Sequence, residues 1–322
     1  MNDKSCALFR AANLRIMDYP FDAALHSALS ICDRAVIVVS DSVDDTDMML
    51  RWHAMDYGHR ITVVHDTFTY DLGWQERWWN TAVSHTDAEW LMFADADEVI
   101  DPCHADTLRG LMDDPEVKLI RFPFIHLYAT CNYRYDFNLT HNTRLGRRSA
   151  GYRMVNQRSA ENPHGAACAM IFDEAGHNAH LPDWNGLVTV DFPILHYGWC
   201  RDAQALALSQ AKHHAWYANG GGLEDGRLPE VEPHNFNLAQ KLTEGKAHLY
   251  EGDHPDIIYP WLNKHAEAWV KIEREVCKHE NKTYDNKQLL ASKPPKVQWT
   301  CANCGITGTQ LAAEVQPNVI PF

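Results

Sequence analysis

The first hundred residues alternate between short apolar runs and segments with a helical pattern. The β-branched run Ala35-Val-Ile-Val-Val39 is typical of a strand buried on both faces, as strands of parallel sheets are. The helix expected at 46–57 follows capping residues and stops before Gly58, a residue that favours a helix end. Strands and helices that alternate in this way predict a parallel sheet covered by helices. The other expected elements are strands at 6–12, 61–65 and 90–93, a helix that includes 25–32, and a helix at 74–83.

Three acids, Asp95, Asp97 and Glu98, follow the apolar run Trp90–Phe93. In an extended backbone, the side chains of Asp95 and Asp97 point to the same face. They would lie at the carboxyl end of a strand, where open α/β sheets bind their ligands. Because neighbouring carboxylates repel each other, a hard divalent cation shared with diphosphate oxygens is their expected partner. The alternative interpretation is an acidic turn on the surface.

The composition bears on the class of protein. The net charge of −14 over 322 residues argues against a non-specific nucleic-acid binder. The sequence shows neither a signal-peptide pattern nor an apolar run of about eighteen residues, so we expect a soluble, cytoplasmic protein without a membrane span. The nine cysteines are scattered and do not indicate a disulfide framework.

The rest of the chain changes character after residue 101. We expect strands at 118–126 and 188–197, the second ending in His196-Tyr-Gly198, and then a helix capped by Asp202. A further helix begins near Pro260, since proline is favoured in a first helical turn. We therefore divide the chain into a nucleotide-sugar-binding half (1–101), an acceptor-binding half (102–200) and a C-terminal helical extension (201–322).

Four motifs in order resemble the family 2-like glycosyltransferases of the GT-A fold. They are the loop at Asp41-Ser-Val-Asp-Asp-Thr, Arg77-Trp-Trp-Asn80, Asp95-Ala-Asp97-Glu98, and Ile194-Leu-His196-Tyr-Gly-Trp-Cys-Arg201. The resemblance implies an α/β fold of GT-A type, with a Rossmann-like, mostly parallel sheet covered by helices. It also implies a nucleoside-diphosphate sugar donor and an inverting transfer.

The resemblance further implies roles for individual residues. Asp41 would contact the nucleotide base or ribose, and Arg77 would lie near the base or diphosphate. Asp97 and His196 would bind Mn²⁺ or Mg²⁺, while Asp95 steadies the ribose or a metal-bound water. The residues assigned to nucleotide binding are Asp41, Arg77, Asp95 and Arg10.

The chemistry of sugar transfer can also be stated from the residues alone. Negative charge develops on the departing diphosphate, and a cation held by Asp97 and His196 would stabilise it. Direct attack by an acceptor hydroxyl needs a carboxylate base. Asp183 is the first candidate for this base, and Asp173 and Glu174 are its competitors, although each also reads as a solvated loop acid. For His196, a buried core histidine is the alternative.

The segment 132–158 concentrates positive charge and aromatic rings. Guanidinium groups suit phosphates, and aromatic rings suit bases or sugars. We therefore expect this segment to bind the acceptor. The acceptor would be either an anionic polymer, such as hydroxymethylated, phage-type DNA, or a cell-surface glycan or its lipid-linked precursor. Internal ion pairs are the alternative. The residues assigned to the acceptor are Arg134, Arg144, Arg147, Arg148 and Arg153.

The tail contains a possible structural zinc site. Its ligands would be Cys277, His279, Cys301 and Cys304, and two reduced thiols in a turn are the alternative. Two other protein classes remain open. A sugar nucleotidyltransferase would carry a glycine-rich phosphate loop, which 10–22 lacks, and a non-catalytic sugar-binding module would need no paired metal-binding acids.

Overall fold

The computed structural model describes residues 3–66, 74–137, 139–155, 169–172, 177–178, 185–219, 229–276, 282–290, 296–301 and 307–311. The strands of its main sheet are β1 (Ser5–Ala11), β2 (Arg34–Val39), β3 (Ile61–His65), β4 (Trp90–Ala94), β5 (Glu98–Val99), β6 (Leu119–Tyr128), β7 (Thr130–Tyr135), β8 (His141–Arg147), β12 (Leu187–Thr189), β13 (Ile194–Trp199) and β14 (Ala247–Leu249). The helices are α1 (Phe21–Ile31), α2 (Thr46–Tyr57), α3 (Trp74–Ser84), α4 (Ala105–Asp113), α5 (Ala203–Asn219), α6 (Leu238–Thr243) and α7 (Tyr259–Val276).

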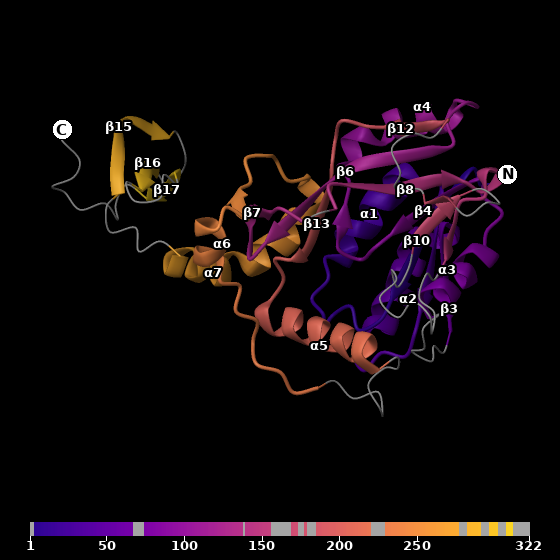
Figure 1. Cartoon of the computed structure of the whole chain (residues 1–322), viewed down its shortest axis with the longest axis horizontal. Coiled ribbons are helices and arrows are strands. Elements are labelled where there is room, and N and C mark those ends of the chain that lie inside the picture. The colour runs from indigo at the N-terminus through magenta and orange to yellow at the C-terminus, as the bar shows by residue number, and fades with distance from the viewer. Residues whose placement is uncertain are drawn as a thin grey trace.

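The main sheet confirms the predicted α/β fold class (Figure 1). Its neighbouring strands run in the order β14-β7-β6-β8-β4-β1-β2-β3. Strands β3, β2, β1 and β4 are all parallel, which brings their carboxyl ends to one edge. Beyond β4 the directions are mixed, since β8 runs antiparallel to both β4 and β6.

Helices cover both faces of the parallel half because its strands are apolar on both faces. Phe9 of β1 belongs to a core with Phe21 and Leu25 of α1, which α4 joins through Leu108. Leu8, the neighbour of Phe9, faces the opposite side. There the core continues into α3, whose Trp78 and Trp79 are buried.

One strand expectation is wrong. The expected strand at 188–197 is two strands, β12 and β13, which both pair in parallel with β6. Pro193 lies between them and has no backbone N–H to donate to a sheet ladder. The interruption lets β13 pair with a later part of β6 than β12 does, bringing His196 opposite His126.

The C-terminal third contains the expected helices. Asp202 caps α5, because its Oδ1 accepts hydrogen bonds from the backbone N–H groups of Gln204 (2.9 Å) and Ala205 (3.1 Å). Figure 1 shows a small antiparallel sheet beyond α7. It consists of β15 (Lys282–Leu290), β16 (Lys296–Cys301) and β17 (Thr307–Leu311). A second small sheet contains β9 (Arg153–Val155), β10 (Ala169–Phe172) and β11 (His177–Asn178). In the described part of the chain, none of the helices could cross a membrane.

The buried carboxylate of Asp18 connects the first loop of the chain to the C-terminal helices. Asp18, in the loop between β1 and α1, accepts hydrogen bonds from the backbone N–H of Asp202 (3.0 Å) and from Lys264 Nζ (2.6 Å). His265 Nε2 lies 3.0 Å from Asp18 Oδ2, the oxygen that also accepts from Asp202. Burial alone would raise the pKa of Asp18, but His265 and Lys264 lower it. The loop after β1 is therefore fixed to α5 and α7.

Candidate functional site

The acidic motif lies in a turn after β4, and this corrects one sequence expectation. The backbone N–H of Glu98 donates to the carbonyl of Asp95 (3.3 Å), so the residues between them are not extended. Asp95 and Asp97 consequently contact different partners instead of sharing one direction. Asp95 accepts hydrogen bonds from Arg10 (3.0 Å) and Arg144 (2.8 Å), whereas Asp97 faces His196.

Arg144 links Asp95 to Glu98. Its Nη2 donates to both carboxylates. Burial would raise the pKa of Asp95, but the Arg10 and Arg144 guanidiniums hold it well below its usual range. Burial raises the pKa of Glu98 to about 7, and Arg144 only partly offsets this effect. Asp95 is thus an ionised acceptor held between two guanidinium groups.

Asp97 and His196 form the second half of the site. Asp97 Oδ2 lies 3.5 Å from His196 Nε2, and the aspartate is 9% exposed. Burial disfavours the charged form of both groups. The charge of the partner outweighs this effect, so the pKa of Asp97 is lowered and that of His196 is raised. The backbone N–H of Tyr197 donates to the Asp97 carbonyl (2.8 Å), which ties the acidic turn to β13.

Gly198 leaves a space beside this pair. A Cβ at Gly198 would lie 2.6 Å from Asp97 Oδ2 and 2.6 Å from His196 Nε2. The space is therefore next to one carboxylate oxygen and one imidazole nitrogen, a donor set that suits a divalent cation. Among the described residues no group of three His, Cys, Asp or Glu side chains is placed to hold a metal ion, and Asp95 is bound by Arg10 and Arg144 instead.

A second histidine, His126, lies next to His196. His126 of β6 and His196 of β13 are register partners, and their Nδ1 atoms are 3.0 Å apart. The sequence analysis did not identify His126. Both histidines follow apolar residues in a strand, but only the pairing of β6 with β13 brings them together.

A cavity of about 310 Å³ opens at the carboxyl ends of β2 and β3. Its lining consists of Val39, Ser40, Asp41, Ser42, Asp47, His65 and Asp66. Asp41, named from the sequence for nucleotide contact, is thus on a concave surface at the edge of the sheet that also carries Asp95. Arg10, at the end of β1, lies between the cavity and Asp95.

Arg77 lies on the solvent side of α3. Trp78 and Trp79 pack inward: Trp78 Nε1 donates to the Val38 carbonyl (2.8 Å), and Trp79 meets Phe93 edge to face (4.8 Å). This packing leaves Arg77 and Asn80 exposed, three residues apart on the same helix face.

Aromatic rings extend from the histidine pair towards the C-terminal helices. Phe137 contacts His126 (4.5 Å between ring centroids), Tyr135 (4.6 Å) and Trp199 (5.3 Å). Each of the three aromatic rings is only partly buried. We call Tyr135, Phe137 and Trp199 the aromatic platform.

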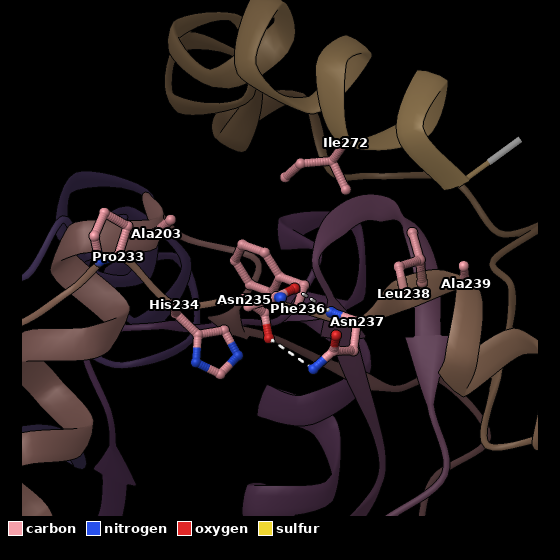
Figure 2. Close-up of a pocket in the computed structure, with 9 residues that line it drawn as sticks. All are labelled: Ala203, Pro233, His234, Asn235, Phe236, Asn237, Leu238, Ala239 and Ile272. Atoms are coloured by element: carbon pink, nitrogen blue, oxygen red, sulfur yellow. Dashed lines mark hydrogen bonds between the residues drawn. The ribbon is translucent and has the colours of Figure 1, made fainter. Parts of the chain in front are cut away.

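A larger cavity, of about 460 Å³, lies beyond the platform (Figure 2). Tyr128 connects the two, because its ring contacts Tyr135 (5.0 Å) and Phe236 in the cavity wall (5.9 Å). The cavity is lined by Ala203, Pro233, His234, Asn235, Phe236, Asn237, Leu238, Ala239 and Ile272. None of these residues is acidic or a permanent cation, and burial lowers the pKa of His234.

Four of the five arginines assigned to the acceptor make contacts within the chain, in line with the alternative of internal partners. Arg144 is 7% exposed and binds the acidic turn. Arg147 donates to backbone carbonyls at 112, 114 and 117 and lies over the Trp90 ring (4.7 Å). Arg148 donates to carbonyls at 83, 86 and 88. Arg134 is exposed, and Arg153 donates to the Gly151 carbonyl. Arg144, Arg147 and Arg148 therefore do not present a shared phosphate-binding face.

Several predicted residues lie outside the described part of the chain. These are the candidate bases Asp183, Asp173 and Glu174, and the zinc candidates Cys277, His279 and Cys304. Cys301 ends β16, where only the backbone is described. The base and zinc assignments stay predictions.

The parallel half-sheet, with its acidic turn at the carboxyl ends, defines an α/β protein of the predicted GT-A class. Residues 21–173 match the model of the family described as glycosyl transferase family 2, which confirms the resemblance seen in the motifs. No protein with a curated description matches the chain.

Solved structures give fold comparisons at low identity. The mannosyltransferase PcManGT from Pyrobaculum calidifontis, in complex with GDP-Man and Mn²⁺, is 16% identical, with 84% of this chain and 70% of that chain covered and a TM-score of 0.36. TarS 1–349 from S. aureus, in complex with UDP-GlcNAc, is 19% identical over 36% of this chain and 33% of that chain, with a TM-score of 0.29. Glucosyl-3-phosphoglycerate synthase from Mycobacterium tuberculosis, in complex with Mn²⁺, UDP and glucosyl-3-phosphoglycerate, is 18% identical over 38% of this chain and 44% of that chain, with a TM-score of 0.27. In the last two comparisons the chain spans less than half of the other protein.

Proposed function

We propose that this protein transfers a sugar from a nucleoside diphosphate to an acceptor hydroxyl, with a divalent cation held by Asp97 and His196. The observation that carries the proposal is the buried carboxylate–imidazole pair beside the space at Gly198. A bound Mn²⁺ or Mg²⁺ would supply Lewis-acid stabilisation of charge on the departing diphosphate. Two protein ligands are enough, because such ions commonly keep substrate phosphates and waters as further ligands.

The remaining residues of the site have distinct proposed roles. Arg10 and Arg144 neutralise Asp95 and orient it at the edge of the sheet. Asp95 then remains an acceptor for a ribose hydroxyl or a water. Asp183 is the first candidate for the base that accepts the proton of the acceptor hydroxyl. Asp173 and Glu174 are the alternative candidates. Direct displacement of this kind inverts the configuration of the sugar carbon.

The cavity lined by Asp41 fits the base and ribose of the donor. Its carboxylates can accept hydrogen bonds from base N–H and ribose O–H groups, but they would repel a diphosphate. Neighbouring strands are about 4.8 Å apart, so β2 and β4 lie ~10 Å from each other across β1. That separation suits a nucleotide with its base at Asp41 and its diphosphate near Asp97. Arg77 is proposed to border the same donor.

Replacing Asp41 by alanine is expected to weaken nucleoside-diphosphate binding about 10- to 100-fold, because one hydrogen bond to a charged group contributes roughly 1.5–3 kcal/mol. Calorimetry with UDP and GDP would measure the change. Asp56→Ala is the matched control, since Asp56 is also exposed but lies outside the cavity. Arg77→Ala tests the neighbouring helix. Unchanged affinity in both Asp41→Ala and Arg77→Ala would remove these residues from the donor site.

An uncharged carbohydrate is the acceptor we propose, in place of DNA. The aromatic platform adjoins the histidine pair, and partly exposed rings offer flat apolar faces on which sugar rings can stack. The cavity of Figure 2 continues it with amide side chains and without charged groups. The internal contacts of Arg144, Arg147 and Arg148 remove the main support for a polyanionic acceptor.

Tyr135→Ala is expected to raise the KM for a neutral oligosaccharide acceptor about 5- to 10-fold, with little change in donor binding. The reason is that Tyr135 belongs to the aromatic platform and packs against Phe137, not against the acidic turn. Steady-state kinetics would measure the change, and Trp52→Ala, which removes an exposed ring elsewhere, is the control. A salt series with hydroxymethylated DNA separates the two acceptor classes. Steep, salt-sensitive binding of DNA by the wild type would contradict the carbohydrate proposal.

A further inference from the structure

His126 and His196 share one hydrogen-bonding position. Their Nδ1 atoms are 3.0 Å apart, and the two rings meet nearly edge to face, at 79°. A hydrogen bond between two Nδ1 atoms needs a proton on one and a lone pair on the other. The arrangement therefore couples the tautomer of one ring to that of the other.

The direction of this hydrogen bond decides what His196 can bind. Its Nε2 is the atom that faces Asp97 and the space at Gly198. A neutral imidazole with its proton on Nδ1 presents a lone pair at Nε2, as a metal ligand must. In the opposite tautomer, Nε2 carries the proton and cannot ligate. An acceptor at Nδ1 favours the first form.

Geometry gives His126 the acceptor role, because its Nδ1 lies 3.0 Å from the Nδ1–H that His196 must carry when its Nε2 lone pair binds a cation. The His126 ring is 8% exposed and packs against Phe124 (4.7 Å) and Phe137 (4.5 Å), an apolar environment that disfavours the doubly protonated form. A neutral His126 that accepts at Nδ1 carries its proton on Nε2. Within the described residues, Nε2 is buried and makes no hydrogen bond of normal geometry, although the Leu139 backbone favours a proton on this ring.

Burying a polar imidazole in an apolar environment is destabilising, so a histidine at this position is not explained by packing alone. A phenylalanine would fill the same apolar space without that penalty. What histidine adds is the Nδ1 lone pair directed at His196.

We propose that His126 is a positioning residue that holds His196 in the tautomer with a lone pair on Nε2, directed at the cation. The inference rests on the proposed metal site, because it concerns how one ligand of that site is oriented. It assigns His126 no contact with substrate or cation.

Two variants at position 126 separate tautomer control from packing. His126→Phe keeps an aromatic ring and removes the acceptor, whereas the amide oxygen of His126→Gln can still accept from His196. We expect Mn²⁺ affinity to fall about 10- to 100-fold in His126→Phe, the range found for partners of metal ligands. In His126→Gln it should stay within a few fold of the wild type. Calorimetric titration with Mn²⁺ alone gives both values.

The ring nitrogens provide a readout independent of activity. In the metal-free protein Asp97 favours a proton on Nε2, so nitrogen NMR is done with saturating Mg²⁺, where it should show the proton of His196 on Nδ1 in the wild type and in His126→Gln. It should be redistributed towards Nε2 in His126→Phe. Wild-type Mn²⁺ affinity in His126→Phe, or an equal loss in both variants, would overturn the inference. If wild type and Asp97→Asn bind Mn²⁺ equally, it is the metal site itself that fails.

Discussion

Asp97→Asn is expected to lower sugar transfer by about 10²- to 10³-fold and to abolish specific Mn²⁺ binding. The substitution removes the carboxylate charge beside the space at Gly198, and loss of one preorganised charge-stabilising group commonly has an effect of this size. The fold should survive, because the amide can still accept a hydrogen bond from His196. The backbone hydrogen bond from Tyr197 to the residue 97 carbonyl is also unaffected.

The measurements are calorimetry with Mn²⁺, and transfer from a panel of nucleotide sugars with and without chelator. Asp87→Asn is the matched control, since Asp87 precedes β4, as Asp97 follows it, but is exposed. Thermal unfolding checks that the variant is folded. Full transfer by Asp97→Asn, or by the wild type in excess chelator, would rule out the proposed cation site.

Gly146→Ala is expected to destabilise the protein by about 3 kcal/mol, at the upper end of the range for overpacking a core. A Cβ at Gly146 would lie 2.3 to 2.7 Å from three ring atoms of Tyr152. That ring cannot move away easily. It is buried against Phe93 (5.1 Å), and its hydroxyl donates to the Thr143 carbonyl (2.9 Å).

Urea denaturation followed by fluorescence would measure this change. Gly110→Ala is the control, because Gly110 lies exposed in α4 with no atom within 4 Å of an added Cβ. There alanine should be neutral or stabilising by up to ~1 kcal/mol, since glycine is unfavourable inside helices. A Gly146→Ala midpoint at or above that of Gly110→Ala would contradict the packing argument.

Local patterns predicted the parallel half of the fold well. Helix α2 and strand β3 have the expected bounds, because caps, a stop glycine and β-branched runs act over a few residues. The error at 188–197 also has a local cause, since Pro193 was visible in the sequence. Hydrophobicity suggested one strand, but backbone hydrogen bonding required a break.

The sequence placed candidate site residues at strand ends, but it could not show which of them contact each other. Arg144 is 49 residues from Asp95 and 46 from Glu98 in sequence, and His126 is 70 residues from His196. These contacts follow from the mixed order of β8, β6 and β13 in the sheet, which no short-range pattern encodes. The same limit explains the arginine segment. Local charge density cannot reveal that Arg147 and Arg148 bind backbone carbonyls.

The contacts of Asp18 impose an order on folding during synthesis. Its partners Asp202 and Lys264 are 184 and 246 residues later in the chain. At translation rates of about 5–20 residues per second, Asp18 therefore waits on the order of tens of seconds for Lys264. During that interval its carboxylate lacks both partners, although Ser42, Asp44 and Thr46 can already hold the earlier part of the loop. The parallel strands can pair early, but the end of the first loop is among the last parts of the protein to gain its final contacts.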